Sequence, residues 1–125
     1  MTFRELNLKD DILSAIEELG YVQPMPVQEK TIPFMLEQTA DLVALAQTGT
    51  GKTAAFGLPV LHMIDASQKK VQALVLAPTR ELCIQISNDL KGYSKNMHGM
   101  RVVPVYGGED IRTQLKQLDT PPQIS

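Results

Sequence analysis

The chain has 125 residues, of which 43% are hydrophobic and 21% charged; this composition suits a single globular domain and excludes collagen-like, coiled-coil and disordered classes. Its 12 basic and 14 acidic side chains give a net charge of −2, so it lacks the basic excess of proteins that hold nucleic acid by bulk charge. A single cysteine, Cys83, excludes an intrachain disulfide, and the chemistry fits a reducing cytoplasm. No apolar run is long enough to predict a membrane segment.

The amino-terminal third is expected to be helical. Apolar residues at helical spacing predict a helix over residues 8–19, with Asn7 as its N-cap and Gly20 just past its end. Residues 27–32 can form a second, short helix. Pro33 is expected to break or restart it, because proline lacks a backbone N–H.

The remainder alternates between short apolar runs and amphipathic stretches. Continuous apolar runs of this length predict strands that are buried on both faces, here over residues 42–46, 71–77 and 102–106. The intervening stretches predict helices over residues 51–64, from behind Thr79 to about Tyr93, and over 111–118, and residues 123–125 resemble the beginning of another strand. This alternation predicts an α/β fold with a parallel sheet flanked by helices. The three loops that follow the strands should lie at one edge of that sheet, where such folds bind ligands: 46–53, 78–81 and 107–110.

The first of these loops has the pattern of a phosphate-binding loop. The run from Ala46 to Thr53 reads Ala-Gln-Thr-Gly-Thr-Gly-Lys-Thr, follows a predicted strand and opens a predicted helix. Its glycines would let backbone N–H groups face a phosphate, Lys52 would reach the β- and γ-phosphates, and the Thr53 hydroxyl would bind Mg²⁺. The strict pattern has glycine where this chain has Ala46. The alternative is an ordinary strand-to-helix turn that contains two glycines.

Further motifs appear in order along the chain. Phe3 and then the run Gly20 to Gln28 are similar to a Q motif, Ala46–Thr53 to motif I, Pro78–Leu82 to motif Ia, and Gly107-Gly108 to a glycine pair. In these motifs the chain resembles the amino-terminal RecA-like domain of DEAD-box ATP-dependent RNA helicases, a superfamily 2 family, over nearly all of its length. Met25 stands where this family usually has threonine, and Cys83 where a small residue is usual.

The resemblance implies a RecA-like fold of the P-loop NTPase class, a parallel sheet flanked by helices and truncated before its later strands. Residues 1–125 would form the amino-terminal part of helicase domain 1, with a Q-motif region over 1–40 and a P-loop and sheet core over 41–125. The implied ligands are ATP or ADP, Mg²⁺ and single-stranded or duplex RNA. Lys52 and Thr53 would be the catalytic residues, with Thr53 on the metal, and the nucleotide would be held by Phe3, Gln28, Thr48, Gly49, Thr50, Gly51, Lys52 and Thr53.

Chemistry supports these implied roles to different degrees. A glutamine amide offers the donor and acceptor that can read N6 and N7 of adenine, as is implied for Gln28, although Gln28 alone would be read as a helix-surface residue. Phe3 would stack on the base or merely anchor the first helix. RNA contacts are implied for Pro78, Thr79, Arg80, Glu81, Gly107 and Gly108. Glu81 could instead restrain Arg80, and the two glycines could serve only to make a turn.

Phosphoryl transfer in this class also needs an acidic pair after a strand and an arginine for the transition state. Glu109-Asp110 does not supply that pair, because it is predicted to open a helix. We therefore expect the ATP-binding part of an ATP-dependent RNA helicase, inactive alone, whose cytoplasmic parent uses a second RecA-like domain to couple ATP hydrolysis to RNA unwinding. Two alternatives stay open: a stand-alone nucleotide-binding or partner-docking module, and a DNA helicase of the same superfamily. An exposed sheet edge would also favour self-association of the chain.

Overall fold

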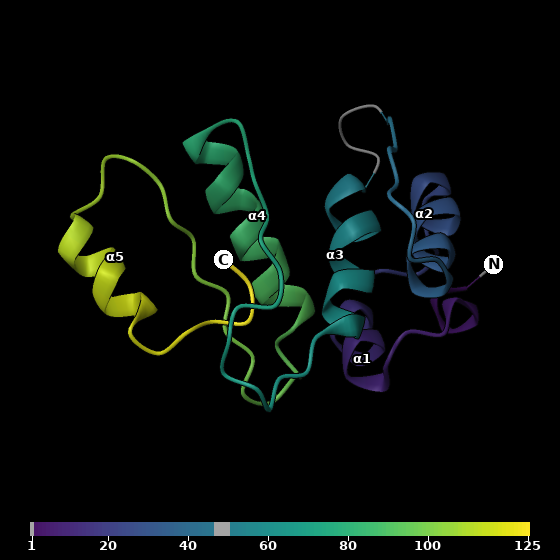
Figure 1. Cartoon of the computed structure of the whole chain (residues 1–125). Helices are drawn as coiled ribbons and strands as arrows, with labels where there is room; N and C mark the ends of the chain where they lie inside the picture. The colour runs from purple at the N-terminus through teal and green to yellow at the C-terminus, as the bar shows by residue number, and fades with distance from the viewer. Residues whose placement is uncertain (1, 47–50) are drawn as a thin grey trace. The chain divides into compact units, whose positions relative to one another are not determined.

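The computed structural model describes residues 2–46 and 51–125, and the chain divides into two compact units, Met1–Met63 and Ile64–Ser125. The described helices of the first unit are the 3₁₀-helix η1 (Phe3–Leu6), α1 (Asp10–Glu18), α2 (Pro26–Glu37) and α3 (Lys52–Met63). Those of the second unit are α4 (Arg80–Tyr93) and α5 (Ile111–Leu118) (Figure 1). No helix among the described residues has both the length and the apolar character needed to cross a membrane.

Helix α1 confirms the first predicted helix, but its start is different. Asn7 is not the N-cap; it has φ 63° and ends η1, a left-handed conformation that asparagine tolerates better than most residues. Lys9 takes the N-cap position instead, and its backbone N–H donates to Nδ1 of His62 over 3.1 Å. Gly20, with φ +87°, follows the end of the helix as predicted.

The prediction that Pro33 breaks the second helix is wrong, because α2 continues through it to Glu37. A proline inside a helix removes one backbone hydrogen bond. Here α2 packs against α3 and Ile32 is fully buried, so burial of the apolar face offsets that loss. Helix α3 also contains a proline, Pro59, which lies in its buried part.

In the second unit, three extended segments pair in parallel. Residues 123–125 lie between the other two: Ile124 bridges to Ala73 on one side and to Val102 on the other. Backbone N–H groups of Val75 and Val103 donate to Ser125 and Ile124 over 2.9 and 3.1 Å. Both bridges are parallel and both involve residues 123–125, while the predicted parallel sheet itself stays a prediction. Within the described residues the pairing consists of isolated bridges and not of regular strands.

One side chain, Gln123, gathers the loops around this pairing. It is 1% exposed, and its amide nitrogen donates to the carbonyls of Ala66, Gln68 and Gly99 at 3.1–3.2 Å. Its amide oxygen accepts from the backbone N–H of Arg101 over 2.9 Å. The core of the second unit is therefore organised by residues 123–125.

The predicted burial of the apolar runs on both faces is wrong for residues 42–46 and 71–77, whereas in the third run the adjacent Val102 and Val103 are both buried. Val43 and Leu45 are 86% and 93% exposed, and no backbone hydrogen bond joins residues 42–46 to another described residue. Leu74 and Leu76 are also exposed. A continuous apolar run is expected where a segment is covered from two sides, and the described residues of each unit cover these segments from one side at most.

Side-chain caps begin the two helices of the second unit, and the cap at Thr79 is predicted from the sequence. The Thr79 hydroxyl accepts from the backbone N–H of Leu82 over 3.1 Å at the start of α4. A carboxylate oxygen of Asp110 accepts from the N–H of Arg112 over 2.9 Å at the start of α5. These caps satisfy N–H groups that a helix start leaves without an intrahelical partner.

Candidate functional site

The predicted phosphate loop leads into the first turn of α3. Lys52 and Thr53 are the first two residues of that helix, with Lys52 exposed and Thr53 half-buried. Gly51 precedes them with φ +80°, a left-handed conformation that favours glycine. Thr48, Gly49 and Thr50, predicted to contact the phosphates, lie outside the described residues. The described part thus places an ammonium and a hydroxyl group at a helix start, where the helix dipole favours anions.

Gln28 joins this helix start to the first turn of α2. Its amide oxygen accepts from the backbone N–H of Met25 over 2.9 Å, and its amide nitrogen donates to the carbonyl of Gly51 over 3.2 Å. The side chain is 2% exposed, so it is not the helix-surface glutamine of the alternative interpretation. Both ends of the amide already hold backbone groups, although each end has capacity for one more hydrogen bond.

The sequence carries a signal for half of this arrangement. A glutamine three residues after an N-cap is the second member of a capping box, and Met25 is the N-cap of α2. The contact with Gly51 has no such signal, because 23 positions separate the two residues. A Cβ at position 51 would lie 2.2 Å from the amide nitrogen of Gln28, so glycine is required there by space as well as by φ.

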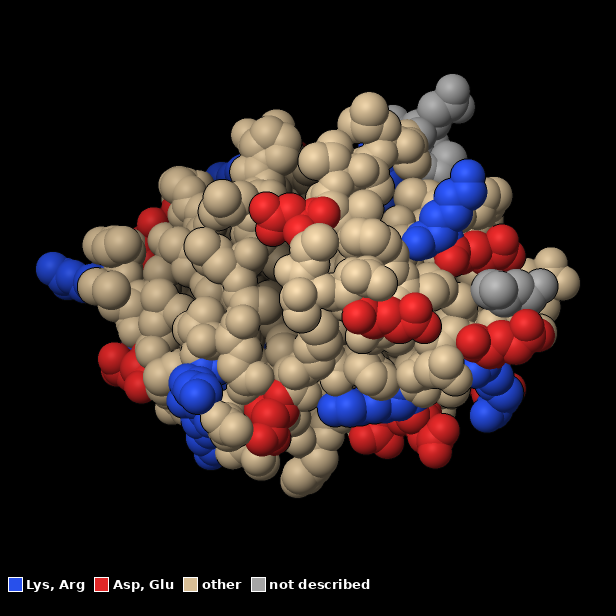
Figure 2. Space-filling model, turned by 45° about the vertical axis from the view of Figure 1, so that its right-hand side comes forward, with Lys and Arg blue, Asp and Glu red and all other residues tan. Residues whose placement is uncertain are grey.

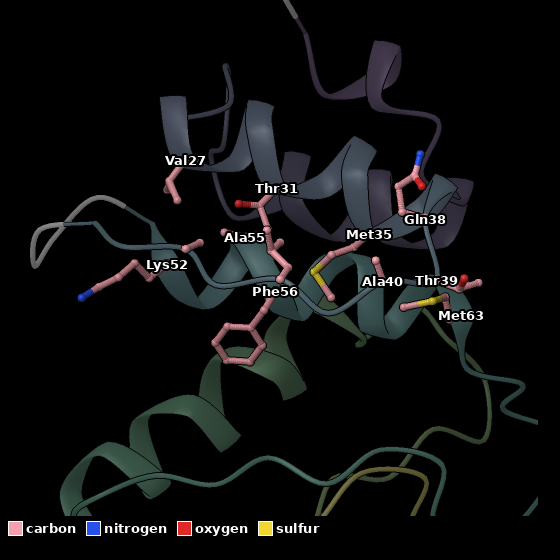
Figure 3. A pocket seen from close by; sticks show the side chains of 12 residues that line it. Val27, Thr31, Met35, Gln38, Thr39, Ala40, Lys52, Ala55, Phe56 and Met63 are labelled. Carbon is pink, nitrogen blue, oxygen red and sulfur yellow. The ribbon is translucent and has the colours of Figure 1, made fainter.

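A cavity of about 640 Å³ lies between α2, α3 and residues 38–44 (Figure 3). Its lining is mostly apolar and includes Met35, Phe56 and Met63, with Lys52 at one end. Figure 3 shows the Lys52 amine pointing away from the other labelled side chains. Neither Phe3 nor Gln28 lines this cavity, so it does not unite the residues predicted to hold the nucleotide.

Phe3 lies in η1 and is 5% exposed. Its ring centroid is 6.2 Å from that of Tyr21, with the planes tilted by 38°, and both residues line a hollow of about 370 Å³. Such spacing is typical of a favourable aromatic pair. Phe3 therefore anchors η1 against the segment that follows α1, and Tyr21, a residue that our sequence reasoning did not select, is the more exposed of the two rings.

The second unit brings together two of the predicted loops. The Arg80 guanidinium carbon lies 5.0 Å from the centroid of the Tyr106 ring, a cation–π distance. A Cβ on Gly108, whose φ is +89°, would lie 2.9 Å from Nη1 of Arg80. Gly107 has open space around it, and Pro78 and Thr79 are exposed. Arg80 and the glycine pair are thus neighbours, as expected if the loops 78–81 and 107–110 share one edge.

The carboxylates of Glu109 and Glu81 differ in the contacts that they make around Arg80 and Tyr106. The pKa of Tyr106 is raised, first because its hydroxyl donates a hydrogen bond to Glu109. Partial burial and the negative charge of Glu109 raise this pKa further, whereas the positive charge of Arg80 lowers it. Glu81, predicted as an alternative restraint on Arg80, forms no ion pair with it in the described part of the chain. Tyr106 is therefore the side chain that contacts the guanidinium.

Charged side chains are mixed in sign where they can be seen, and the described residues contain no evident metal site. On the face shown in Figure 2, acidic and basic side chains are interspersed among a larger uncharged surface. Within residues 2–46 and 51–125, no three His, Cys, Asp or Glu side chains form a group that could hold a metal ion.

Comparison with models of known protein families identifies the family of this chain. The family model described as DEAD/DEAH box helicase matches residues 25–125. The chain belongs to the DEAD/DEAH box helicase family. The matched residues include all of α2 and α3 and both helices of the second unit.

Relatives and solved structures agree with this assignment. The chain is 50% identical over 124 residues to an ATP-dependent RNA helicase CshA of Limosilactobacillus reuteri, covering 99% of this chain and 24% of the relative. It is 51% identical over 122 residues to that of Listeria monocytogenes, covering 98% of this chain and 23% of the relative. The chain thus spans about a quarter of the length of these curated relatives.

Two crystal structures have the same fold. A DEAD box protein from the hyperthermophile Methanococcus jannaschii superposes with a TM-score of 0.91 at 37% identity, over 99% of this chain and 34% of that one. The RNA helicase Prp28 from Chaetomium thermophilum bound to ADP gives 0.86 at 36% identity, over 98% and 31%. The DEAD-box members of the family therefore share the fold of this chain, which is of the P-loop NTPase class.

Proposed function

We propose that this chain is the ATP-binding part of an ATP-dependent RNA helicase. The observation that carries the proposal is the start of α3, where Gly51 in a left-handed conformation precedes the exposed Lys52 and the half-buried Thr53. Supporting it are the family match and the printed names of the relatives, which are ATP-dependent RNA helicases. One of the similar structures is described as bound to ADP.

In this proposal the ATP phosphates lie at the N-terminus of α3. Lys52 binds the β- and γ-phosphates through charge-assisted hydrogen bonds, and Gly51 leaves the approach free of a Cβ. Thr53 has the hydroxyl oxygen that a Mg²⁺ ion accepts as a ligand, so this residue fits the metal. When bound, Mg²⁺ would neutralise phosphate charge.

Gln28 is proposed to read the adenine. Its amide retains one donor and one acceptor position, which match N6 and N7 of the base. With only 2% of the side chain exposed, the base reaches it only if the residues that cover it move. Phe3, proposed to contact the base, is also buried, so both roles require the first unit to open locally when ATP binds.

RNA is proposed to bind along the two adjoining loops of the second unit. The first turn of α4 presents backbone N–H groups and the exposed Arg80 side chain, and Gly107 leaves room for a sugar-phosphate backbone. The residues assigned to this surface are Pro78, Thr79, Arg80, Glu81, Gly107 and Gly108. Such contacts bind phosphate without reading sequence.

The wider architecture follows the same assignment. We infer that the parallel bridges of the second unit belong to a RecA-like parallel sheet and that the exposed apolar residues 42–46 form a further strand of it. In the parent, a cytoplasmic enzyme, a second RecA-like domain would complete the ATP and RNA sites. Alone, the uncovered segments would favour self-association.

The experiment that tests nucleotide binding is calorimetric titration of the chain with Mg²⁺ and ATP. Lys52→Ala is expected to weaken ATP binding about 10- to 100-fold, because a charge-assisted hydrogen bond contributes about 1.5–3 kcal/mol. The matched control is Lys91→Ala, which removes an exposed lysine from the last turn of α4 and should leave ATP affinity unchanged. Equal affinities of Lys52→Ala and the unmodified chain, with both folded, would reject the phosphate-loop assignment.

A further inference from the structure

The Arg80 side chain is held by a ring and not by a carboxylate. Its guanidinium lies 5.0 Å from the Tyr106 ring centroid, and no acidic side chain of the described residues forms an ion pair with it. A cation–π contact does not use the N–H donors of the guanidinium in hydrogen bonds to an acceptor. The contact therefore holds Arg80 near the ring while leaving its hydrogen-bond donors for another ligand.

Gly108 leaves the space into which this guanidinium extends. A Cβ on that residue would lie 2.9 Å from Nη1 of Arg80, closer than side-chain atoms normally approach. A Cβ on Gly107 would meet nothing within 4 Å. The two glycines are thus not equivalent: the room at position 108 is taken by Arg80, and the room at position 107 is free.

Glu109, three residues further along the same turn, interacts with the Tyr106 hydroxyl and raises the pKa of that group. The face of the ring contacts Arg80 from another loop. The Glu109 carboxylate is engaged by the hydroxyl and forms no ion pair with the guanidinium.

We infer that Tyr106 is a positioning residue for RNA binding: it holds the Arg80 guanidinium beside Gly108, so that the donors of Arg80 face a phosphate that lies along the Gly107 side of the turn. This inference rests on the proposed function, because it adds to the RNA surface assigned above. Tyr106 acts through Arg80 and does not itself contact the RNA.

The first measurement is spectroscopic and needs no RNA. Protons above an aromatic ring are shifted upfield, so the Arg80 side-chain NMR signals should show this shift in the unmodified chain. Tyr106→Leu should remove it and Tyr106→Phe should retain it, because phenylalanine keeps the ring and loses only the hydroxyl bond to Glu109. A retained shift in Tyr106→Leu would overturn the inference.

The second measurement is NMR titration of the full 125-residue chain with a short single-stranded oligouridylate. Tyr106→Leu should weaken binding about two- to five-fold, the range for an exposed cation–π contact, and Tyr106→Phe should bind like the unmodified chain. Arg80→Ala should weaken binding about ten-fold. Combining Arg80→Ala with Tyr106→Leu should add nothing further, because Tyr106 acts only through Arg80. Lys91→Ala, at the other end of α4, is the charge control.

The outcomes separate this inference from the function on which it rests. If Arg80→Ala weakens binding and Tyr106→Leu does not, the positioning role is overturned and the RNA surface stands. If the double variant is weaker than Arg80→Ala, Tyr106 contacts RNA directly and the inference is again overturned. If Arg80→Ala binds like the unmodified chain, the RNA surface falls, and the inference with it.

Gly108→Ala provides a second perturbation in case Tyr106→Leu does not fold. Its Cβ should displace the guanidinium and weaken RNA binding to the level of Arg80→Ala, with Tyr106 intact. Gly107→Ala has open space around its Cβ and should leave the Arg80 NMR signals unchanged; it is a control for those signals alone, because Gly107 lies on the proposed RNA surface. Equal Arg80 signals in Gly108→Ala and the unmodified chain would contradict the assigned geometry.

Discussion

Replacing Gly51 by alanine tests the contact between the phosphate loop and Gln28. Gly51 has φ +80°, and a Cβ there would lie 2.2 Å from the amide nitrogen of Gln28 and 3.3 Å from Cγ of Met25. The left-handed conformation costs a residue with a Cβ about 1–2 kcal/mol, and loss of the Gln28–Gly51 hydrogen bond costs about 1 kcal/mol. We therefore expect Gly51→Ala to lower the free energy of unfolding by about 2–3 kcal/mol.

Gly20 supplies the matched control for this substitution. It lies in the same unit with a similar φ of +87°, but a Cβ on it would meet nothing within 4 Å. Gly20→Ala should therefore carry only the conformational cost of about 1–2 kcal/mol. The difference between the two variants isolates the steric contact with Gln28.

A double-mutant cycle makes the test sharper. In a Gln28→Ala background the amide is gone, so Gly51→Ala should cost about 1 kcal/mol less than it does in the unmodified chain. Urea unfolding followed by circular dichroism at the helical band measures all four free energies. If Gly51→Ala costs no more than Gly20→Ala, or if the cycle shows no coupling, Gln28 does not abut Gly51 as described.

Three further outcomes are expected. The unmodified chain should prefer ATP to GTP, and Gln28→Ala should narrow that preference in calorimetric titrations; equal affinities before substitution would remove the adenine role. Burial and the nearby Lys9 charge lower the pKa of His62 from its ordinary value of 6.5. As the pH falls, the His62 imidazole is therefore protonated in the unfolded chain before it is protonated in the folded chain. The contribution of neutral His62 to the free energy of unfolding should be fully present above pH 6.5 and should decrease below that pH. His62→Gln should make this decrease smaller, and His98→Gln should leave it unchanged. Phosphate release by the 125-residue chain should not be stimulated by RNA, and stimulated release that Lys52→Ala abolishes would refute this.

Sequence periodicity predicted the helices that have one apolar face. Helix α4 is an example: Ile86, Leu90 and Tyr93 recur at helical spacing and are buried, and Thr79 caps the helix as predicted. The course of α2 could not be predicted in the same way. Proline has a local cost that predicts a break at Pro33, and only the packing against α3 shows that the helix continues.

Local motifs also predicted that a helix starts at the proposed phosphate loop, but not the side chains that support this start. Gly51, Lys52 and Thr53 are adjacent in sequence, and their placement at the start of α3 follows from the motif. Neither the contact of Gln28 with Gly51 nor that of Tyr106 with Arg80 has a local signal, because each joins residues more than twenty positions apart. Such contacts depend on tertiary structure, which periodicity does not encode.

The position of residues 123–125 between two earlier segments bears on how the chain folds during synthesis. All residues of the first unit have left the ribosome once Met63 has emerged, so that unit can fold early. Residues 71–75 and 101–103 cannot pair through their shared neighbour until residues 123–125 arrive, and Gln123 cannot join the surrounding loops before then. The exposed Leu74 and Leu76 then lie on an unpaired nascent segment for the time taken to add about fifty residues, an interval of roughly 3–10 s at common elongation rates.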